Sequence, residues 1–322
     1  MTPTLSVAFC TYNRASQLPG LVDALRRQQC PVPFEILAVD NNSSDETPHL
    51  LQDLARRDGA PLRYVREARQ GIPFARNRAI AESLRAGTEF LLFIDDDELP
   101  APGLLSAAAD ALGREGAECV GGRIRVVLPD GRRPRWLTED MMGFLGALDH
   151  GDGALWVRDL DTPLWSGNIG YRTAIFAEDE NLRFDVRYNR RGAGVGGGSD
   201  AIMFRELVGR GAAIRYRPDM EVCHYVELDK ISRSYFLRLH FAAGRKFGEY
   251  RSPEYERAFL GVPPFLIRQA AGHWLRVLAM AVRRDVNTVR QAMNGSYALG
   301  TILGLHRRYR RYPSRGAERG SS

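Results

Sequence analysis

Short apolar runs alternate with segments of helical spacing through the first hundred residues, and this alternation constrains the fold more than any other feature of the chain. The apolar runs have the length of strands and fill residues 5–9, 34–39, 62–65 and 90–94. The segments of helical spacing are 17–28, 47–57 and 73–86. Strands separated by helices form βαβ units with parallel strands. The sequence therefore predicts an α/β fold with a Rossmann-like, doubly wound, mostly parallel sheet.

Polar clusters follow three of these predicted strands. They are Thr11-Tyr12-Asn13-Arg14, Asp40-Asn41-Asn42-Ser43-Ser44-Asp45 and Asp95-Asp96-Asp97-Glu98. Ligands of doubly wound sheets bind outside the carboxyl ends of the strands. We therefore expect the three clusters to converge on one crevice.

The third cluster belongs to the run FLLFIDDDELP, in which an apolar strand leads directly into four acids. Adjacent carboxylates repel one another, and the low dielectric at a sheet edge strengthens the repulsion unless a cation is present. A hard divalent ion with oxygen ligands, Mg²⁺ or Mn²⁺, would relieve it, and such ions usually bind together with substrate phosphates. The alternative is a solvated acidic turn that Pro100 ends.

The other polar residues suit a nucleotide. Tyr12 can stack on a base, and an ionised Asp40 can accept hydrogen bonds from a base N–H or from ribose hydroxyls. Asp45 is interpreted as a helix N-cap. In GIPFARNRAI, Arg76 lies in the first turns of a helix, where it could face a diphosphate, although a simple surface arginine is the alternative.

Length and composition bound the class of protein. At 322 residues and 44% hydrophobic content, the chain can bury the core of one large domain or of a domain with an appendage. The four cysteines have no paired spacing, which argues against a zinc site or a disulfide framework and fits a reducing cytoplasm. An apolar strand follows the N-terminus at once, so no signal peptide is expected, and no apolar run reaches the roughly 18 residues of a spanning helix. We expect a cytoplasmic protein.

Positive charge gathers at the C-terminal end. Residues 251–322 contain 13 Arg and 4 acids, a net of +9, which leaves −3 for residues 1–250 of a chain whose net charge is +6. Helical spacing is expected over 265–282 and 292–305, followed by the basic and aromatic run 306–312. These features predict either amphipathic helices on the inner face of the cell membrane or a helical pair packed on the catalytic domain. Residues 313–322 read as disordered.

The motifs CTYNR, VDNNSSDET, GIPFARN and FIDDDELP, in this order and spacing, resemble the family 2 glycosyltransferases, which are inverting nucleotide-sugar enzymes with a GT-A fold. The resemblance continues through WSGN and LRFD to GGGSDAIMFREL and RPDMEVCHY. It implies a GT-A domain over 1–230, with a nucleotide-sugar half at about 1–100 and an acceptor half at about 101–230. Residues 231–312 would form a helical, basic extension.

The resemblance also implies roles for residues of the donor site. The family's D-x-D falls on Asp95, near the ribose or sugar, and on Asp97, a metal ligand. Asp96 would face the other side if the strand pleat continued that far. His224 matches a histidine that often completes the metal site, whereas a lone histidine after a strand is more often packed or solvated. The residues expected to bind the nucleotide sugar are Thr11, Tyr12, Asn13, Asp40, Arg76, Asp95 and Asp96.

On the acceptor side, the family's catalytic base falls on Asp200, which would take the proton of the attacking hydroxyl. Ser199 stands where the family commonly has Glu. The missing carboxylate would affect the choice of acceptor, whereas the catalytic base is kept. Trp165 and Asn168, with Ser199, would line the loop that meets the acceptor or the donor sugar. The glycine run 192–198 lacks the Lys-Ser/Thr ending of a phosphate loop and predicts a mobile flap before the base.

The implied reaction is transfer of a hexose, from a UDP-sugar in particular, to an acceptor hydroxyl with inversion and with Mn²⁺ or Mg²⁺. The acceptor could be a saccharide, a lipid-linked glycan or a small molecule, in polysaccharide or glycoconjugate biosynthesis or in natural-product glycosylation. A nucleotidyltransferase would normally carry a glycine-rich, basic loop where CTYNRASQ stands. A noncatalytic nucleotide-sugar binding protein would not need Asp95, Asp97 and Asp200 together. An anionic membrane surface is a further expected partner, and nucleic acid is not.

Overall fold

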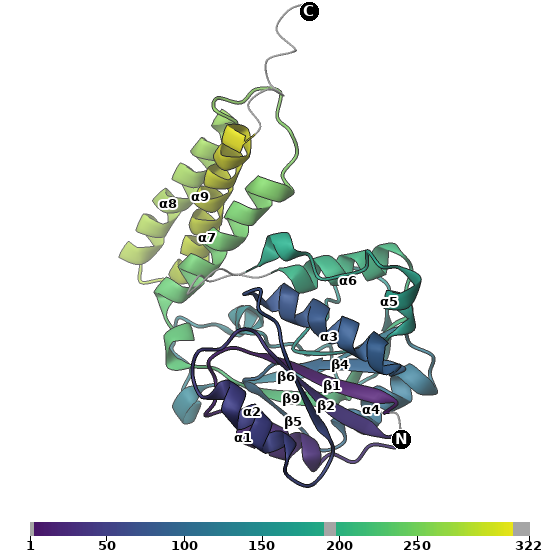
Figure 1. Ribbon diagram of the computed structural model, residues 1–322. Coiled ribbons are helices and arrows are strands. Elements are labelled where there is room, and N and C mark those ends of the chain that lie inside the picture. The colour runs from purple at the N-terminus through teal and green to yellow at the C-terminus, as the bar shows by residue number, and fades with distance from the viewer. Residues whose placement is uncertain (1–2, 190–197, 312–322) are drawn as a thin grey trace, which may run out of the picture. The chain divides into compact units, whose positions relative to one another are not determined.

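The structure is a computed structural model that describes residues 3–189 and 198–311 (Figure 1). The described chain forms two compact units. The first comprises residues 3–129, 145–189 and 198–226, and the second comprises 130–144 and 227–311. The predicted flap residues 192–197 and the predicted tail 313–322 lie outside the described residues.

One mixed sheet organises the first unit. The strands found in the described residues are β1 (Leu5–Thr11), β2 (Phe34–Asp40), β3 (Leu62–Arg66), β4 (Phe90–Ile94), β5 (Glu98–Pro100), β6 (Cys119–Val127), β7 (Leu155–Val157), β8 (Asn168–Arg172) and β9 (Ile214–Tyr225). Their order is β3-β2-β1-β4-β8-β6-β9-β5, and β7 pairs with β9. Strands β1 to β4 are mutually parallel, whereas β8 runs antiparallel to both β4 and β6. The doubly wound sheet predicted from the first hundred residues is confirmed.

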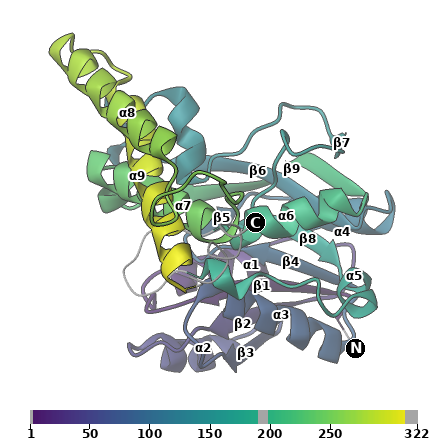
Figure 2. The same ribbon diagram turned by 90° about the horizontal axis from the view of Figure 1, so that it is seen from above.

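Helices cover both faces of this sheet. They are α1 (Leu18–Arg26), α2 (Thr47–Ala55), α3 (Ile72–Ala86), α4 (Leu104–Gly113), α5 (Ala174–Glu178) and α6 (Ser199–Gly209). Figures 1 and 2 show α1 and α2 on one face and α3 and α6 on the other. Every residue of β1 and β4 is buried as a result, which explains why these strands read as continuous apolar runs.

Helix α3 begins and ends where its sequence directs. Gly71 precedes it with a φ of +135°, a backbone conformation that residues with a Cβ rarely adopt, and Pro73 lies in its first turn, where a missing N–H costs nothing. Gly87, with a φ of +69°, ends the helix in the left-handed conformation. These two glycines fix where Arg76 stands relative to the end of β4.

The second unit contains α7 (Arg233–Tyr250), α8 (Pro264–Val282) and α9 (Thr288–Arg311). Helix α9 lies between the other two (Figure 1). Glycines allow α7 and α9 to cross closely: a Cβ on Gly244 would lie 2.0 Å from the Tyr297 carbonyl oxygen, and one on Gly300 would lie 2.1 Å from that of Phe241. Among the described helices, none is both long and apolar enough to cross a membrane.

Candidate active site

The three polar clusters meet at one edge of the sheet. Strands β2, β1 and β4 are adjacent and parallel, and the register pairs Thr11 with Asp40 at the carboxyl ends of β1 and β2. Strand β4 ends at Ile94, so Asp95 begins the acid run at the same edge. Because parallel strands end on the same side, the predicted convergence of the clusters follows from the topology.

Asn13 joins the loop after β1 to the loop after β2. Its N–H donates to Ser43 Oγ (2.9 Å), and its Oδ1 accepts from the Ser44 N–H (2.8 Å). Asn13 and Asn42 have φ values of 52° and 67°, in the left-handed region that asparagine tolerates better than most residues. Tyr12, beside this junction, is 47% exposed, so its ring is accessible to a ligand.

Asp40 is enclosed at the base of this loop pair. It is fully buried, its Oδ1 accepts from the Ser43 N–H (3.0 Å), and the Tyr64 hydroxyl lies 3.5 Å from its Oδ2. Burial and the charge of Asp40 raise the pKa of Tyr64, so the phenol keeps its proton. Thr11 is buried as well. The contacts of Asp40 and Thr11 with a nucleotide stay predictions, since a neighbouring side chain must move to admit a ligand.

Strand pairing anchors the turn that carries the acid run. Strand β5 begins at Glu98, which pairs with His224 on β9, and the Tyr225 N–H donates to the Asp97 carbonyl oxygen (3.1 Å). As a result, His224 Nε2 lies 3.5 Å from Asp97 Oδ1. The two residues that the sequence assigns to the metal are therefore neighbours in space.

Asp97 and His224 fit part of a divalent metal site. Within the described chain, His224 Nε2 is buried and makes no hydrogen bond, which leaves a nitrogen ligand beside a carboxylate. No group of three His, Cys, Asp or Glu side chains in the described residues is placed to hold an ion by itself. Mg²⁺ and similar ions usually keep waters and take oxygen ligands from substrate phosphates, so one or two protein ligands are sufficient. The residues present fit a metal that binds with a diphosphate.

Arg14 neutralises the acid run from one side. Its Nε lies 3.7 Å from Asp96 Oδ1, and its Nη1 lies 3.6 Å from Asp97 Oδ2. Strand β4 ends at Ile94, so the pleat does not continue to Asp96 and does not turn its side chain away from that of Asp97. Both carboxylates lie near the Arg14 guanidinium. Burial raises the pKa of Asp96 to about 7, although the charge of Arg14 opposes the shift.

Glu98 supports the turn from below. It is buried, and its Oε2 accepts from the Asp95 N–H (3.2 Å). A Cβ on Gly167 would lie 2.7 Å from Glu98 Oε1, so a larger residue there would require the Glu98 carboxyl to shift. Burial and the charges of Asp95 and Asp97 raise the pKa of Glu98 well above its usual value. Its surroundings therefore disfavour the charged form of Glu98 more than water would.

Arg76 is a buried cation on the other side of the acid run. Its Nη2 lies 2.9 Å from Asp95 Oδ1, and its guanidinium carbon lies 5.5 Å from the centre of the Phe184 ring. Burial lowers the pKa of Arg76, but the charges of Asp95 and Asp200 outweigh it and raise the pKa above its usual value. Asp200 and the acid run thus act on one shared guanidinium.

Asp200 stands in the first turn of α6. Gly198, with a φ of +110°, precedes this helix, and Asp200 Oδ1 accepts from the Ala201 N–H (3.0 Å). Asp200 is half-buried, whereas Ser199 is buried. Of the two residues, Asp200 is the one that a bound molecule can reach.

Two other predicted residues have structural roles. Trp165 is half-buried against the core. Asn168 is buried, and its amide donates to the carbonyl oxygens of Arg123 (3.0 Å) and Met220 (2.6 Å), which ties β8 to β6 and to the middle of β9. Contact of either residue with a sugar stays a prediction, and the Asn168 amide nitrogen is already used inside the sheet.

The sequence reasoning missed residues that position the site. Asn77 forms a two-way link with Phe184: its Nδ2 donates to the Phe184 carbonyl oxygen (2.9 Å) and its Oδ1 accepts from the Phe184 N–H (2.8 Å). Asn41 Oδ1 accepts from the Gly71 N–H (2.6 Å), which holds the start of α3. Asn77 follows Arg76 in GIPFARN, and Arg14 follows Asn13 in CTYNR. Their position next to a predicted site residue was the signal from which a role for them could have been inferred.

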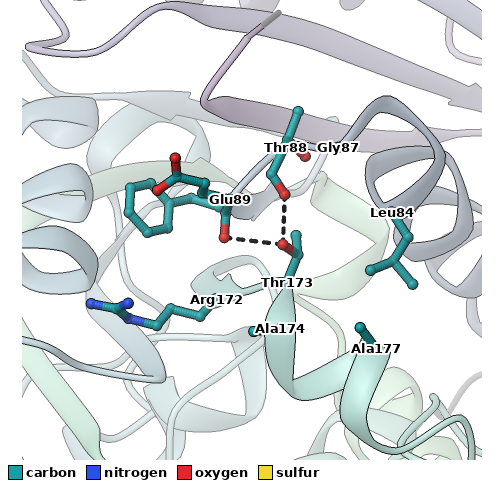
Figure 3. A pocket seen from close by; sticks show the side chains of 9 residues that line it. Leu84, Gly87, Thr88, Glu89, Arg172, Thr173, Ala174 and Ala177 are labelled. Atoms are coloured by element: carbon teal, nitrogen blue, oxygen red, sulfur yellow. Dashed lines mark hydrogen bonds between the residues drawn. The ribbon is translucent and has the colours of Figure 1, made fainter.

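A hollow of about 330 Å³ lies at the opposite end of β4 (Figure 3). Its lining includes Gly87, Thr88, Glu89 and Arg172, and the Thr173 hydroxyl donates to the carbonyl oxygens of Thr88 (2.5 Å) and Glu89 (3.1 Å). No predicted site residue lines it. The acid run and the residues around it lie at the carboxyl end of β4, away from this hollow.

Comparison with known proteins assigns the family. Residues 6–180, more than half of the chain, match the model described as Glycosyl transferase family 2. The chain belongs to glycosyl transferase family 2. The family resemblance inferred from the four motifs is confirmed.

Curated relatives of this family 2 chain match it over part of their length. A PGL/p-HBAD biosynthesis glycosyltransferase of Mycobacterium bovis is 34% identical over 111 residues, which cover 34% of this chain and 42% of that protein. Glycosyltransferase AglE of Haloferax volcanii is 28% identical over 130 residues, or 40% of this chain and 42% of that protein. The matched stretches thus span about two fifths of the length of these relatives.

Solved structures of family 2-like architecture match nearly the whole chain. The mannosyltransferase PcManGT from Pyrobaculum calidifontis, in complex with GDP-Man and Mn²⁺, has a TM-score of 0.60 at 18% identity, covering 95% of this chain and 88% of that one. S. aureus TarS 1-349 in complex with UDP has a TM-score of 0.52 at 18% identity, covering 95% and 91%. These likenesses show that the chain has the GT-A fold.

Proposed function

We propose that this chain is a glycosyltransferase that moves a hexose from a nucleoside diphosphate donor, UDP-hexose in particular, to an acceptor hydroxyl with inversion. The observation that carries the proposal is that His224 Nε2 lies 3.5 Å from Asp97, in the same acid run whose Asp95 pairs with the buried Arg76. Family membership supports the reaction class, and the GDP-Man and UDP in the structural neighbours support a nucleotide donor.

Residues at the carboxyl ends of β1 and β2 and near the N-terminus of α3 would bind the donor. The exposed Tyr12 ring stacks on the base, and Asp40 accepts from the base or the ribose once the side chains around it move. Arg76 and Arg14 are the cations nearest the acid run, and either can donate charge-assisted hydrogen bonds to a diphosphate. Asp95 then lies between the Arg76 guanidinium and the donor sugar or ribose.

Asp97 and His224 would hold Mn²⁺ or Mg²⁺. When bound, such an ion neutralises the negative charge that develops on the leaving diphosphate. Asp97 and His224 are held in place by the pairing of β5 with β9, so they are preorganised for this role. The Mn²⁺ in the PcManGT complex supports the choice of metal.

Asp200 would act as the general base. Its carboxylate takes the proton of the attacking acceptor hydroxyl while the hydroxyl oxygen bonds to the anomeric carbon. The bond from that carbon to the diphosphate oxygen breaks on the opposite face, and the electron pair leaves with the diphosphate. One such displacement inverts the anomeric carbon and needs no covalent intermediate.

The acceptor class follows from the relatives more than from the site. The Mycobacterium relative is named a PGL/p-HBAD biosynthesis glycosyltransferase, and this supports a biosynthetic role, in polysaccharide or glycoconjugate biosynthesis. We propose a saccharide or lipid-linked acceptor, met in the cytoplasm at the inner face of the membrane. Buried Ser199, in place of the family's common Glu, removes a carboxylate beside the acceptor.

A donor screen tests the proposal. The protein with Mn²⁺ is incubated with UDP-glucose, UDP-galactose, UDP-N-acetylglucosamine and GDP-mannose, and release of the nucleoside diphosphate is followed. One donor should be hydrolysed slowly without acceptor and only with the metal, and proton NMR of the first transfer product should show the inverted anomer. No release from any nucleotide sugar with Mn²⁺ or Mg²⁺, or a retained anomer, would contradict the proposal.

A further inference from the structure

Helix α8 has two apolar faces, and only one of them is used inside its unit. Leu266 and Ala270 are buried on the inner face. On the outer face, the exposed fractions of four aliphatic side chains are 56% for Ile267, 67% for Leu275, 64% for Leu278 and 86% for Val282. At 100° per residue, these four positions fall within a stripe about 80° wide.

This outer face, Ile267, Leu275, Leu278 and Val282, is too apolar to be an ordinary exposed surface. Each such side chain gains about 1.5–3 kcal/mol when it leaves water. Single exposed aliphatic residues are common, but a contiguous row of them marks an interaction surface. Of the aromatic side chains of α8, Phe265 is 48% exposed, whereas Trp274 is half-buried, and a Cβ on Gly295 of α9 would lie 3.0 Å from its ring.

The charges along α8 identify what the outer face meets. Residues 264–284 contain no Asp or Glu, and exposed arginines stand at positions 268, 276, 283 and 284. None of these four arginines makes an ion pair within the described chain. Asp285, which follows them, accepts from the Asn287 N–H and caps the next turn. Arg268 borders the aliphatic stripe, and Arg283 and Arg284 follow the last residue of the helix. Aliphatic side chains beside unpaired arginines match an interface of acyl chains and anionic head groups.

Other occupants fit less well. In a symmetric pair of copies joined through α8, two helices that each carry arginines would come together with no acid on either helix to offset the repulsion. Residues 190–197 and 312–322 contain one branched aliphatic residue, Val195.

We propose that the outer face of α8 inserts into the interface of an anionic membrane, with the helix lying along the surface and its arginines on lipid phosphates. This inference rests on the proposed function, which supplies the reaction carried out at the surface. It adds the place where the enzyme meets its acceptor. Each arginine near an anionic surface contributes about 1 kcal/mol, so the four suffice for reversible attachment.

Vesicle co-sedimentation of the full chain tests the proposal. The vesicles are pure phosphatidylcholine or contain about one third phosphatidylglycerol, each at low and high salt. The parent protein should sediment with the anionic vesicles at low salt. Leu275→Glu with Leu278→Glu should lose at least tenfold in partition, and Arg268→Gln with Arg276→Gln several-fold. Leu160→Glu, at a 48% exposed leucine of the first unit, is the matched control and should bind like the parent.

The outcomes separate this proposal from the enzymatic one. Equal sedimentation of the Leu275→Glu/Leu278→Glu variant and the parent would overturn it, as would equal binding to neutral vesicles. Sedimentation velocity without lipid would overturn it as well if the parent were a dimer and this variant a monomer. Donor hydrolysis in solution should be equal in the parent and in the Leu275→Glu/Leu278→Glu variant. If the parent hydrolyses no donor, the proposed function is contradicted, but the membrane proposal is not. Circular dichroism confirms that the substituted chains are folded.

Discussion

Two arginines bracket the acid run, and they differ in what they can do. Arg76 is buried and paired with Asp95 at 2.9 Å, so it is part of the structure of the site. Arg14 lies 3.6–3.7 Å from Asp96 and Asp97, distances that allow attraction but not a good hydrogen bond. Arg14 Nη1 also donates to Gln17 Oε1 (2.8 Å), and this side chain holds a positive charge beside Asp97. We expect that charge to oppose the binding of a cation at Asp97.

Replacing Asp97 should separate metal binding from folding. Asp97→Ala is expected to abolish the Mn²⁺-dependent part of UDP binding, because it removes the carboxylate that lies 3.5 Å from His224 Nε2. The fold should persist, since the Tyr225 N–H bonds the backbone of residue 97, not its side chain. Calorimetry of UDP with and without Mn²⁺ measures this, with Asp53→Ala on α2 as the control. Parent-like affinity would remove Asp97 from the metal site.

Replacing Arg14 should strengthen the binding of Mn²⁺ in the absence of nucleotide, which is opposite to the effect expected of replacing Asp97. In Arg14→Gln, a positive charge close to Asp97 is lost, so Mn²⁺ without nucleotide should bind roughly fivefold tighter, equivalent to about 1 kcal/mol. UDP binding in the presence of Mn²⁺ should weaken. Manganese electron paramagnetic resonance reports the free ion directly, and Arg56→Gln on α2 is the matched control. Unchanged or weaker Mn²⁺ binding would show that Arg14 does not compete with the ion.

Asp200→Asn keeps the shape of the side chain but removes its capacity to accept a proton. We expect turnover to fall by roughly 10²-fold or more while UDP binding is retained. Glu206→Gln, on the same helix and paired with Arg210, should leave the rate unchanged. A parent-like rate in Asp200→Asn would place the base elsewhere.

At the scale of elements, the sequence predicted what depends on local pattern. The four N-terminal strands appear at or within two residues of their expected ends, because buried runs bounded by polar clusters have one interpretation. The nearness of Asp97 and His224 came from the family resemblance, since it depends on pairing between β5 and β9 that no local pattern encodes. The ion pairs of Arg14, the backbone role of Asn168 and the close crossing of α7 and α9 were missed for the same reason.

The α7–α9 crossing should be sensitive to a single methyl group. Gly300→Ala would place a Cβ 2.1 Å from the Phe241 carbonyl oxygen, so the helices must separate, at a cost of roughly 1–3 kcal/mol in the free energy of unfolding. Gly272→Ala on α8 is the matched control, because its Cβ would meet nothing within 4 Å. It should stabilise the helix by up to about 1 kcal/mol. Urea titration compares the two, and equal midpoints would contradict the close crossing.

At the scale of the molecule, the site is held together without a metal. Backbone pairing of β5 with β9, the cations Arg14 and Arg76, and the buried Glu98 carboxyl already stabilise the acid turn. We therefore expect the metal to serve the substrate and not the fold.

Chelation tests this directly. Treatment with EDTA should leave the thermal midpoint and the circular dichroism spectrum unchanged, whereas UDP with excess Mn²⁺ should raise the midpoint by mass action. The rise should vanish when EDTA is added with UDP. A midpoint lowered by EDTA in the absence of nucleotide would mean that the ion is structural.

The pairing of β5 with β9 also sets an order of events during synthesis. Asp97 leaves the ribosome well before His224, and Asp200 is made between them. The loops proposed to bind the nucleotide, residues 11–14 and 40–45, can form early from local βαβ contacts, but the pair proposed to bind the ion requires a contact across more than a third of the chain. Under the proposed function, a nascent chain thus holds its nucleotide loops before it can activate a donor, and we expect catalytic competence only when β9 joins the sheet.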